Sequence, residues 1–361
     1  MPDRRTFLAG MLAAGLAPKP SWADAGSPAY LSAAMAPDGS FVLCGLSAKG
    51  DIAFKLPLPA RGHAAAAHPK RPEAVAFARR PGTFAIVLDC RSGAEIARLA
   101  APEGRHFYGH GAFSPDGDLL FTTENAFEDA RGMIGVWDAS NGYQRLGDFP
   151  SGGVGPHDIR LMPDGTALVV ANGGIETHPE TGRAKLNLPT MRSNLSYVSL
   201  DGRIVEQADL DDTLQKNSIR HLAVSPGGIV AFAMQWQGDL AAHPPLLGLH
   251  APGAPARLIE TERHDTAQMA GYVGSVAISQ DRLAATSPRG GTLQMFDVPA
   301  RGLTGQLKIE DVCGVAPASS GFIATSGLGL VAPNVGSPRG ARTHVVKWDN
   351  HLVVVGCGGA A

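Results

Sequence analysis

One pattern recurs along the chain: a short apolar strand, a tight turn of the Asp-Gly or Gly-Gly kind, and a second apolar strand. Asp-Gly and Gly-Gly pairs suit such turns because they tolerate the positive φ angles that a tight hairpin requires. No segment shows a convincing helical period, so the sequence predicts an all-β fold built from hairpins. The copies of the pattern begin at His63, His110, His157, His221, Ser275 and Gly314.

The spacing of these copies identifies the architecture. Successive starts lie roughly 40–60 residues apart, and about 40–50 residues is the period of a four-stranded blade in a β-propeller. The longest interval contains residues 173–187, which we interpret as an inserted loop. The chain has 361 residues, of which 44% are hydrophobic, so it can bury a large core.

The two ends of the chain supply one further blade. Residues 351–355 are typical of an innermost strand, and residues 30–59 can form the other three strands of the same blade. Such a closure removes the exposed edge that the ring would otherwise have. We therefore predict an all-β, seven-bladed β-propeller whose N- and C-terminal strands share one blade. A ring of six or eight blades is the alternative, because the repeats after residue 300 are weak.

The first residues have the features of a targeting segment. Arg4 and Arg5 resemble the twin-arginine export motif, and an apolar stretch at residues 8–16 follows. Residues 23–25 then match a small-x-small cleavage site. We predict a twin-arginine signal peptide at residues 1–25, a single propeller domain at residues 26–361, and a location in the periplasm. The apolar stretch is too short to span a bilayer, so we expect no membrane span after signal removal.

The cysteines predict neither a metal site nor a redox motif. No pair is spaced as CxxC, and a protein that is exported in its folded state need not form disulfides. Buried free thiols are the favoured interpretation. The four residues are Cys44, Cys90, Cys313 and Cys357.

Histidines dominate the strand starts. In a propeller the innermost strands run along the central axis, so residues at equivalent starts converge at one mouth of the channel. Five of the seven starts are histidine, out of 12 in the chain, which favours a shared functional cluster over simple copying of a turn residue. Neutral imidazole is the commonest nitrogen ligand for transition metals. The predicted metal ligands are His63, His110, His157, His221 and His351.

Other side chains could complete or replace this chemistry. Tyr108, Asp158 and Asp349 are candidate oxygen ligands or orienting groups. Crowded imidazoles disfavour one another's charged forms, so we expect lowered histidine pKa values. The alternative chemistry is binding of an anion by protonated histidines together with Arg61, Arg105 and Arg220.

Loops that follow the second strands are expected to reach the same face. They carry polar side chains and glycines, and two of them contain His178 and His243. The loops lie at residues 124–125, 172–174, 235–238 and 287–291.

Several longer motifs resemble a known family. They include residues 105–117, 155–158, 218–222, 286–291 and 348–351. Together they are similar to the bacterial exported family known as domain of unknown function 1513, across nearly the whole chain after the signal. The resemblance implies no catalytic residue. The histidines characteristic of the family match His106 and the five predicted metal ligands. Members of the family are often encoded near iron-linked periplasmic proteins, which favours iron.

These observations predict a periplasmic metal-binding β-propeller, with iron as the favoured ion, that acts as a binding or accessory protein. The alternatives are a metal-dependent hydrolase or oxidoreductase at the same site, and a protein-interaction platform in which the histidines are architectural. The expected partners are a metal ion or small-molecule ligand and another periplasmic protein. A net charge of −2 without a basic run argues against nucleic acid.

Overall fold

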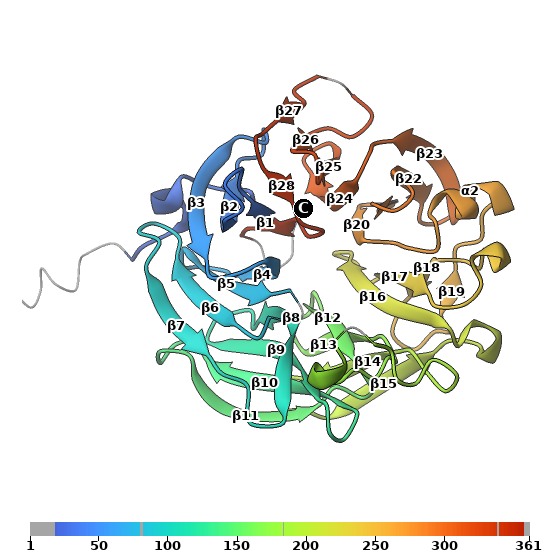
Figure 1. The fold of residues 1–361 in the computed structure, drawn as a ribbon, viewed down its shortest axis with the longest axis horizontal. Helices are drawn as coiled ribbons and strands as arrows, with labels where there is room; N and C mark the ends of the chain where they lie inside the picture. The colour runs from blue at the N-terminus through green and yellow to red at the C-terminus, as the bar shows by residue number, and fades with distance from the viewer. Residues whose placement is uncertain (1–18, 80–81, 183, 338, 357–361) are drawn as a thin grey trace, which may run out of the picture.

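The computed structural model describes residues 19–79, 82–182, 184–337 and 339–356. Within them, seven antiparallel sheets are arranged as blades around a central axis (Figure 1). The seven-bladed propeller predicted from the repeat spacing is therefore confirmed.

Six of the blades are formed by four consecutive strands each. In chain order their strands are β4 (Gly62–Ala67), β5 (Glu73–Ala78), β6 (Ala85–Asp89) and β7 (Glu95–Leu99); β8 (Arg105–Phe113), β9 (Leu119–Ala126), β10 (Arg131–Asp138) and β11 (Gln144–Pro150); β12 (Pro156–Leu161), β13 (Ala167–Asn172), β14 (Asn194–Ser199) and β15 (Ile204–Asp209); β16 (Asn217–Val224), β17 (Val230–Trp236), β18 (Leu247–His250) and β19 (Arg257–Leu258); β20 (Ser275–Ser279), β21 (Arg282–Ser287), β22 (Thr292–Asp297) and β23 (Gly302–Lys308); and β24 (Val312–Ala318), β25 (Gly321–Ser326), β26 (Leu330–Ala332) and β27 (Arg342–Thr343). The short helices are η1 (Trp22–Ala25), η2 (Pro179–Thr181), η3 (Asp212–Leu214), η4 (Leu240–Ala242) and α2 (Arg263–Gln268).

The remaining blade is built from both ends of the chain. Strands β1 (Tyr30–Met35), β2 (Phe41–Leu46) and β3 (Ile52–Leu58) form its outer part. The short C-terminal strands β28 (Lys347–Trp348) and β29 (Val353–Val354) both pair with β1 and occupy the innermost position. The shared closing blade is thus confirmed. However, His351 lies in the break between β28 and β29 and does not open the strand.

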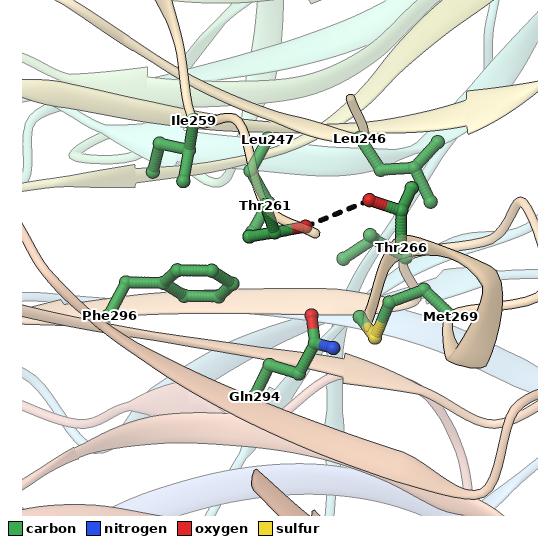
Figure 2. A pocket seen from close by; sticks show the side chains of 9 residues that line it. Leu246, Leu247, Ile259, Thr261, Thr266, Met269, Gln294 and Phe296 are labelled. Carbon is green, nitrogen blue, oxygen red and sulfur yellow. Dashed lines mark hydrogen bonds between the residues drawn. The ribbon is translucent and has the colours of Figure 1, made fainter. Parts of the chain in front are cut away.

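Apolar side chains fill the space between neighbouring blades. Figure 2 shows one such contact, in which Ile259 approaches Phe296 of the next blade beside α2. The hydroxyl groups of Thr261 and Thr266 lie 2.8 Å apart and hydrogen-bond, which satisfies two polar groups at this apolar contact. The blades are therefore held to one another by packing around the whole ring.

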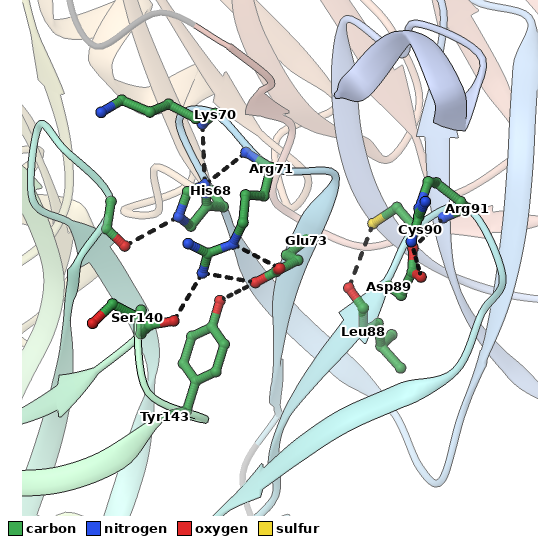
Figure 3. Close-up of polar contacts among 12 residues, drawn as sticks. His68, Lys70, Arg71, Glu73, Leu88, Asp89, Cys90, Arg91, Ser140 and Tyr143 are labelled. Atoms are coloured by element: carbon green, nitrogen blue, oxygen red, sulfur yellow. Dashed lines mark hydrogen bonds and ion pairs between the residues drawn. The ribbon is translucent and has the colours of Figure 1, made fainter. Parts of the chain in front are cut away.

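Polar groups lock the contact between the β4–β7 blade and the β8–β11 blade. Arg71 makes two hydrogen bonds to Glu73, which also accepts one from the Tyr143 hydroxyl of the neighbouring blade at 2.7 Å (Figure 3). The side chain of His68 lies 3.0 Å from the carbonyl oxygen of Gly117, also across the two blades. These contacts fix the relative position of two blades that contribute histidines to the central axis.

The described cysteines are free thiols. Cys44, Cys90 and Cys313 are buried, and burial raises the pKa of each thiol to about 12. The prediction of buried free thiols is confirmed for these three residues. Cys357 lies outside the described residues.

The predicted cleavage site lies in a docked segment. The indole of Trp22, in η1, donates a hydrogen bond of 2.9 Å to the carbonyl oxygen of His68, and Ala25 is buried. Arg4 and Arg5 lie outside the described residues. None of the helices that the structure describes has the length and apolar character needed to cross a bilayer.

Candidate metal centre

The five predicted histidines meet on the propeller axis, although they come from strands far apart in the sequence. The rings of His63 and His351 have centroids 4.5 Å apart, and those of His110 and His221 lie 6.4 Å apart. The other neighbouring pairs fall between these values. We call this cluster the histidine ring; its members are His63, His110, His157, His221 and His351.

The rings lie inside the propeller and not at an open mouth as predicted. His63, His110, His221 and His351 are at most 8% exposed, whereas His157 is half-buried. Two of the histidines lie well inside their strands, whereas His63 and His157 are the second residues of β4 and β12. His110 is the sixth residue of β8 and His221 the fifth residue of β16.

Irregular pairing in the innermost strands directs these side chains to the axis. The register between β4 and β5 shifts between Gly62 and Ala65, a segment that includes His63. Corresponding shifts occur around His110, at His157 and just before His221. A bulge re-aims a side chain that would otherwise follow the regular alternation of the strand. Of the two innermost strands without a histidine, β20 pairs with β21 without a shift, whereas β24 has a shift between Val312 and Val315.

Two glycines permit the close packing of the ring. Gly109 has a φ of +104°, and a Cβ atom built on it would lie 2.6 Å from Cδ2 of His63. A Cβ on Gly314 would lie 3.0 Å from the backbone nitrogen of Leu352, next to His351. Leu352 of the closing blade therefore occupies the space beside Gly314, the strand position at which a histidine is absent.

Ring nitrogens without protein partners face one another. In the described structure, hydrogen-bond partners are lacking for the buried Nδ1 atoms of His63 and His157, the Nε2 atoms of His110 and His351, and both ring nitrogens of His221. Potential ligand atoms of His63, His110 and His351 all lie within 4.8 Å of one another, as do those of His110, His157 and His221. Metal–nitrogen bonds of about 2.1 Å would place ligand atoms about 3.4 Å apart in a tetrahedral site. Small side-chain rotations would therefore bring the ligand atoms of either triad close enough together to bind one ion.

Asp158 orients one side of the ring. Its carboxylate lies 3.1 Å from Nδ1 of His110 and accepts hydrogen bonds from the backbone N–H groups of Ile159 and Leu222. Burial raises the pKa of this carboxyl, but the charges of Arg160 and His110 outweigh burial and hold the pKa well below its ordinary value. The carboxylate is therefore ionised and fixes which nitrogen of His110 faces the axis.

Asp349 has the corresponding position near His63. It accepts 2.7 Å hydrogen bonds from Arg61 and Arg79, and lies 3.9 Å from Nδ1 of His63. Burial again raises its pKa, while His63 and Arg79 lower the pKa by more, so this carboxyl is also ionised. The sequence predicted both carboxylates but missed Arg79 and Arg160, which carry no motif of their own. Arg160 could have been inferred from its position two residues after Asp158, because such residues lie on the same face of a strand and can pair.

The environment favours the uncharged form of four of the imidazoles. Burial is the largest cause of the lowered pKa of His63, which falls to about 4, and the neighbouring charge of His110 adds to it. Burial likewise lowers the pKa values of His157, His221 and His351 well below the usual range. The lowered values expected from crowding are confirmed for these four residues, although burial contributes more than crowding. Neutral imidazole is the form that binds metal ions.

Other predicted residues lie outside the ring. His106 stacks between Tyr108 and Phe127, and the ring of His178 meets Phe127 edge-on at 4.9 Å. The Tyr108 hydroxyl lies 3.2 Å from that of Thr177, and its ring contacts His157 edge-on. These aromatic side chains support the His157 side of the ring.

Two arginines of the alternative anion site pair with carboxylates. Arg61 pairs with Asp349, and Arg105 pairs with Asp148 at 2.9 Å. Arg220 is buried next to His221. The positive charges of Arg61 and Arg105 are therefore already offset by protein groups.

The fold also occurs in a protein of unrelated sequence. A search among curated proteins found no match to the chain. Hydrazine synthase from Kuenenia stuttgartiensis has a similar structure, with a TM-score of 0.58 at 13% sequence identity. The alignment covers 81% of this chain and 91% of that one, and at this identity it shows the fold alone. The family model described as "Protein of unknown function (DUF1513)" matches residues 56–355, and this chain therefore belongs to that family.

Proposed function

We propose that the protein binds one transition-metal ion in the histidine ring and acts in the periplasm as a metal-binding or accessory protein. The observation that carries the proposal is the set of buried ring nitrogens that have no hydrogen-bond partner in the described structure. A buried polar atom without a partner costs about 1–3 kcal/mol, and the ring gathers several such atoms at one point. A bound ion would satisfy one nitrogen of each imidazole that ligates it.

The contacts of His110 favour a single ion. His110 belongs to both triads of potential ligands, but its Nδ1 atom faces Asp158. Only Nε2 remains to bind, and one nitrogen lone pair binds one ion. The two triads are then alternative or overlapping ligand sets for that ion, and the remaining imidazoles surround it.

The carboxylates support the same interpretation. A metal-binding histidine commonly directs its other ring nitrogen to a carboxylate, which fixes the ring and raises its basicity. Asp158 stands in this relation to His110, and Asp349 approaches His63 more distantly. A purely architectural ring would have no need of ionised carboxylates behind two of its imidazoles.

Ligand chemistry narrows the ion without fixing it. Imidazole suits zinc, copper, iron and nickel, and the family resemblance favours iron among them. Twin-arginine export would carry the folded protein with an ion already inserted, consistent with the deep burial of the ring.

The test is metal analysis of the natively exported protein. We expect close to one equivalent of a transition metal by elemental mass spectrometry. His110→Ala and His157→Ala should each lower the metal content, with the secondary structure unchanged by circular dichroism. His264→Ala, at an exposed position in α2, is the matched control. Metal content that is unchanged in the His110→Ala/His157→Ala double variant would show that the ring is architectural.

A further inference from the structure

We propose that Lys185, Arg220 and Arg289 form a binding site for the carboxylate or phosphate group of a small molecule at the entrance to the histidine ring. The inference names a ligand class for the proposed metal site and in that respect rests on the proposed function. The three side chains come from different blades, and none of them belongs to the histidine ring.

Blade topology brings two of these residues to one face. In each blade the second strand ends where the innermost strand begins: Asn172 pairs with Pro156, and Thr286 pairs with Ser275. Loops that follow second strands therefore surround the entrance to the axis. Lys185 lies in the loop between β13 and β14, and Arg289 lies between β21 and β22.

A chain of contacts connects these loops to the histidine ring. The Lys185 ammonium group donates a hydrogen bond to the side-chain oxygen of Gln237, in the loop after β17. The guanidinium of Arg289 lies over the ring of Tyr272, 4.4 Å from its centroid. The Tyr272 hydroxyl accepts a 3.4 Å hydrogen bond from Asn350, the residue before His351.

Arg220 connects the entrance to the ring itself. It lies in β16 directly before His221, at the register shift that directs that histidine to the axis. Its positive charge is the largest charge effect that lowers the pKa of His157. The contacts place Lys185 and Arg289 near each other: Gln237, the partner of Lys185, donates to the carbonyl oxygen of Gln235, which is bridged to Tyr272 beneath Arg289. The lowered pKa of Lys185, caused by burial and then by the charges of Arg220 and Arg289, agrees with this placement. Neighbouring positive charges favour the binding of an anion.

Other arginines on this face are neutralised by carboxylates. Arg79 pairs with Asp349, Arg105 with Asp148, and Arg192 with Asp212. Within the described ranges, Lys185 and Arg289 form no ion pair with a carboxylate. Uncompensated positive charge is thus concentrated on one side of the entrance.

His157 lies on that side of the histidine ring. The residue is partly exposed although its Nδ1 atom is buried, and the charge of Arg220 acts on it. Guanidinium and ammonium groups bind carboxylate and phosphate oxygens through strong charge-assisted hydrogen bonds. A small anion held by the three cations would therefore lie between the solvent and the His157 side of the histidine ring.

The experiment measures anion binding and metal binding separately. Inorganic phosphate and acetate are titrated by calorimetry, at low ionic strength, into metal-free and metal-loaded protein. We expect phosphate, acetate or both to bind, and the Lys185→Gln/Arg289→Gln variant to weaken that binding by about tenfold or more with its metal content unchanged. The matched control is Lys49→Gln/Arg301→Gln, which makes the same charge change at exposed turns on the opposite face.

The outcomes distinguish the two proposals. The His157→Ala variant should lose metal while the metal-free protein still binds the anion. If the natively exported wild-type protein holds no metal but binds the anion through Lys185 and Arg289, the proposed function is wrong and the anion site stands. If neither probe binds at millimolar concentration, or if the Lys185→Gln/Arg289→Gln variant binds as tightly as the wild type, the anion site is wrong.

Discussion

Mild acid should destabilise the metal-free protein through the histidine ring. The pKa of His63 is about 4 in the folded protein, against 6.5 for an ordinary histidine. Because this folded-state pKa is depressed, the unfolded chain binds the proton more readily between these two values. Stability is therefore complete above about pH 6.5 and falls as the pH is lowered toward 4.

The magnitude follows from the shift. Each pKa unit corresponds to about 1.4 kcal/mol, so His63 alone should lower the free energy of unfolding by about 2 kcal/mol at pH 5 and by about 3 kcal/mol at pH 4. His157, His221 and His351 act in the same direction, although coupled sites cannot simply be summed. The depressed pKa of Asp349 acts only below about pH 3.8, outside this window.

The assay is urea unfolding of chelator-treated protein at pH 7.5, 6.5, 5.5 and 5.0. A loss of about 2 kcal/mol should lower the midpoint by about 0.7 M or somewhat less, because the slope is about 3 kcal/mol/M at the top of the range for small proteins and increases with size. His68, at the blade contact in Figure 3, also has its pKa lowered to about 4 by burial and contributes to the total.

Variants separate the contribution of the histidine ring from the rest of the loss of stability at low pH. His63→Gln should reduce the difference in stability between pH 7.5 and pH 5.0, whereas the exposed His264→Gln should leave that difference unchanged. Equal midpoints at pH 7.5 and pH 5.5 in the wild type would refute the reasoning.

Two further predictions follow from the backbone and from the targeting segment. Gly109→Ala should destabilise the protein by about 1–3 kcal/mol and reduce its metal content, because the new Cβ would have a φ of +104° and lie 2.6 Å from His63; unfolding and metal analysis would detect both, and a variant with wild-type values would contradict the packing described. Arg4→Lys together with Arg5→Lys should hold the protein in the cytoplasm if the twin-arginine pathway exports it. Cell fractionation checks this, and normal periplasmic levels would exclude that route.

The blade count could be predicted because each blade repeats a local signal. The Asp-Gly turn after β8 and the one after β12 are encoded within a few residues, so their spacing reveals the ring. The closing blade was also predictable, since residues 351–355 form a strand without a partner nearby in sequence.

The interior of the site could not be predicted in the same way. The register shifts that turn His110 and His221 inward arise from pairing with β9 and β17, and no local residue pattern announces them. For the same reason the histidines were expected at an open mouth, whereas the structure buries them. Lys185 and Arg289 are more than 100 residues apart in the sequence, and only the shared face of the propeller brings their loops to one entrance.

The location of His351 in the closing strand has a consequence for the order of synthesis. The four other ring histidines leave the ribosome with the blades that carry them, whereas His351 lies near the end of the chain, between the two short strands that join the last blade to the first. The complete ring therefore exists only after residues 347–354 have been synthesised and have paired with β1. An ion bound by His63, His110 and His351 would then join strands from opposite ends of the chain. Such an ion would hold the closing blade together and slow the opening of the propeller, so that loss of the ion and opening of the propeller would occur together.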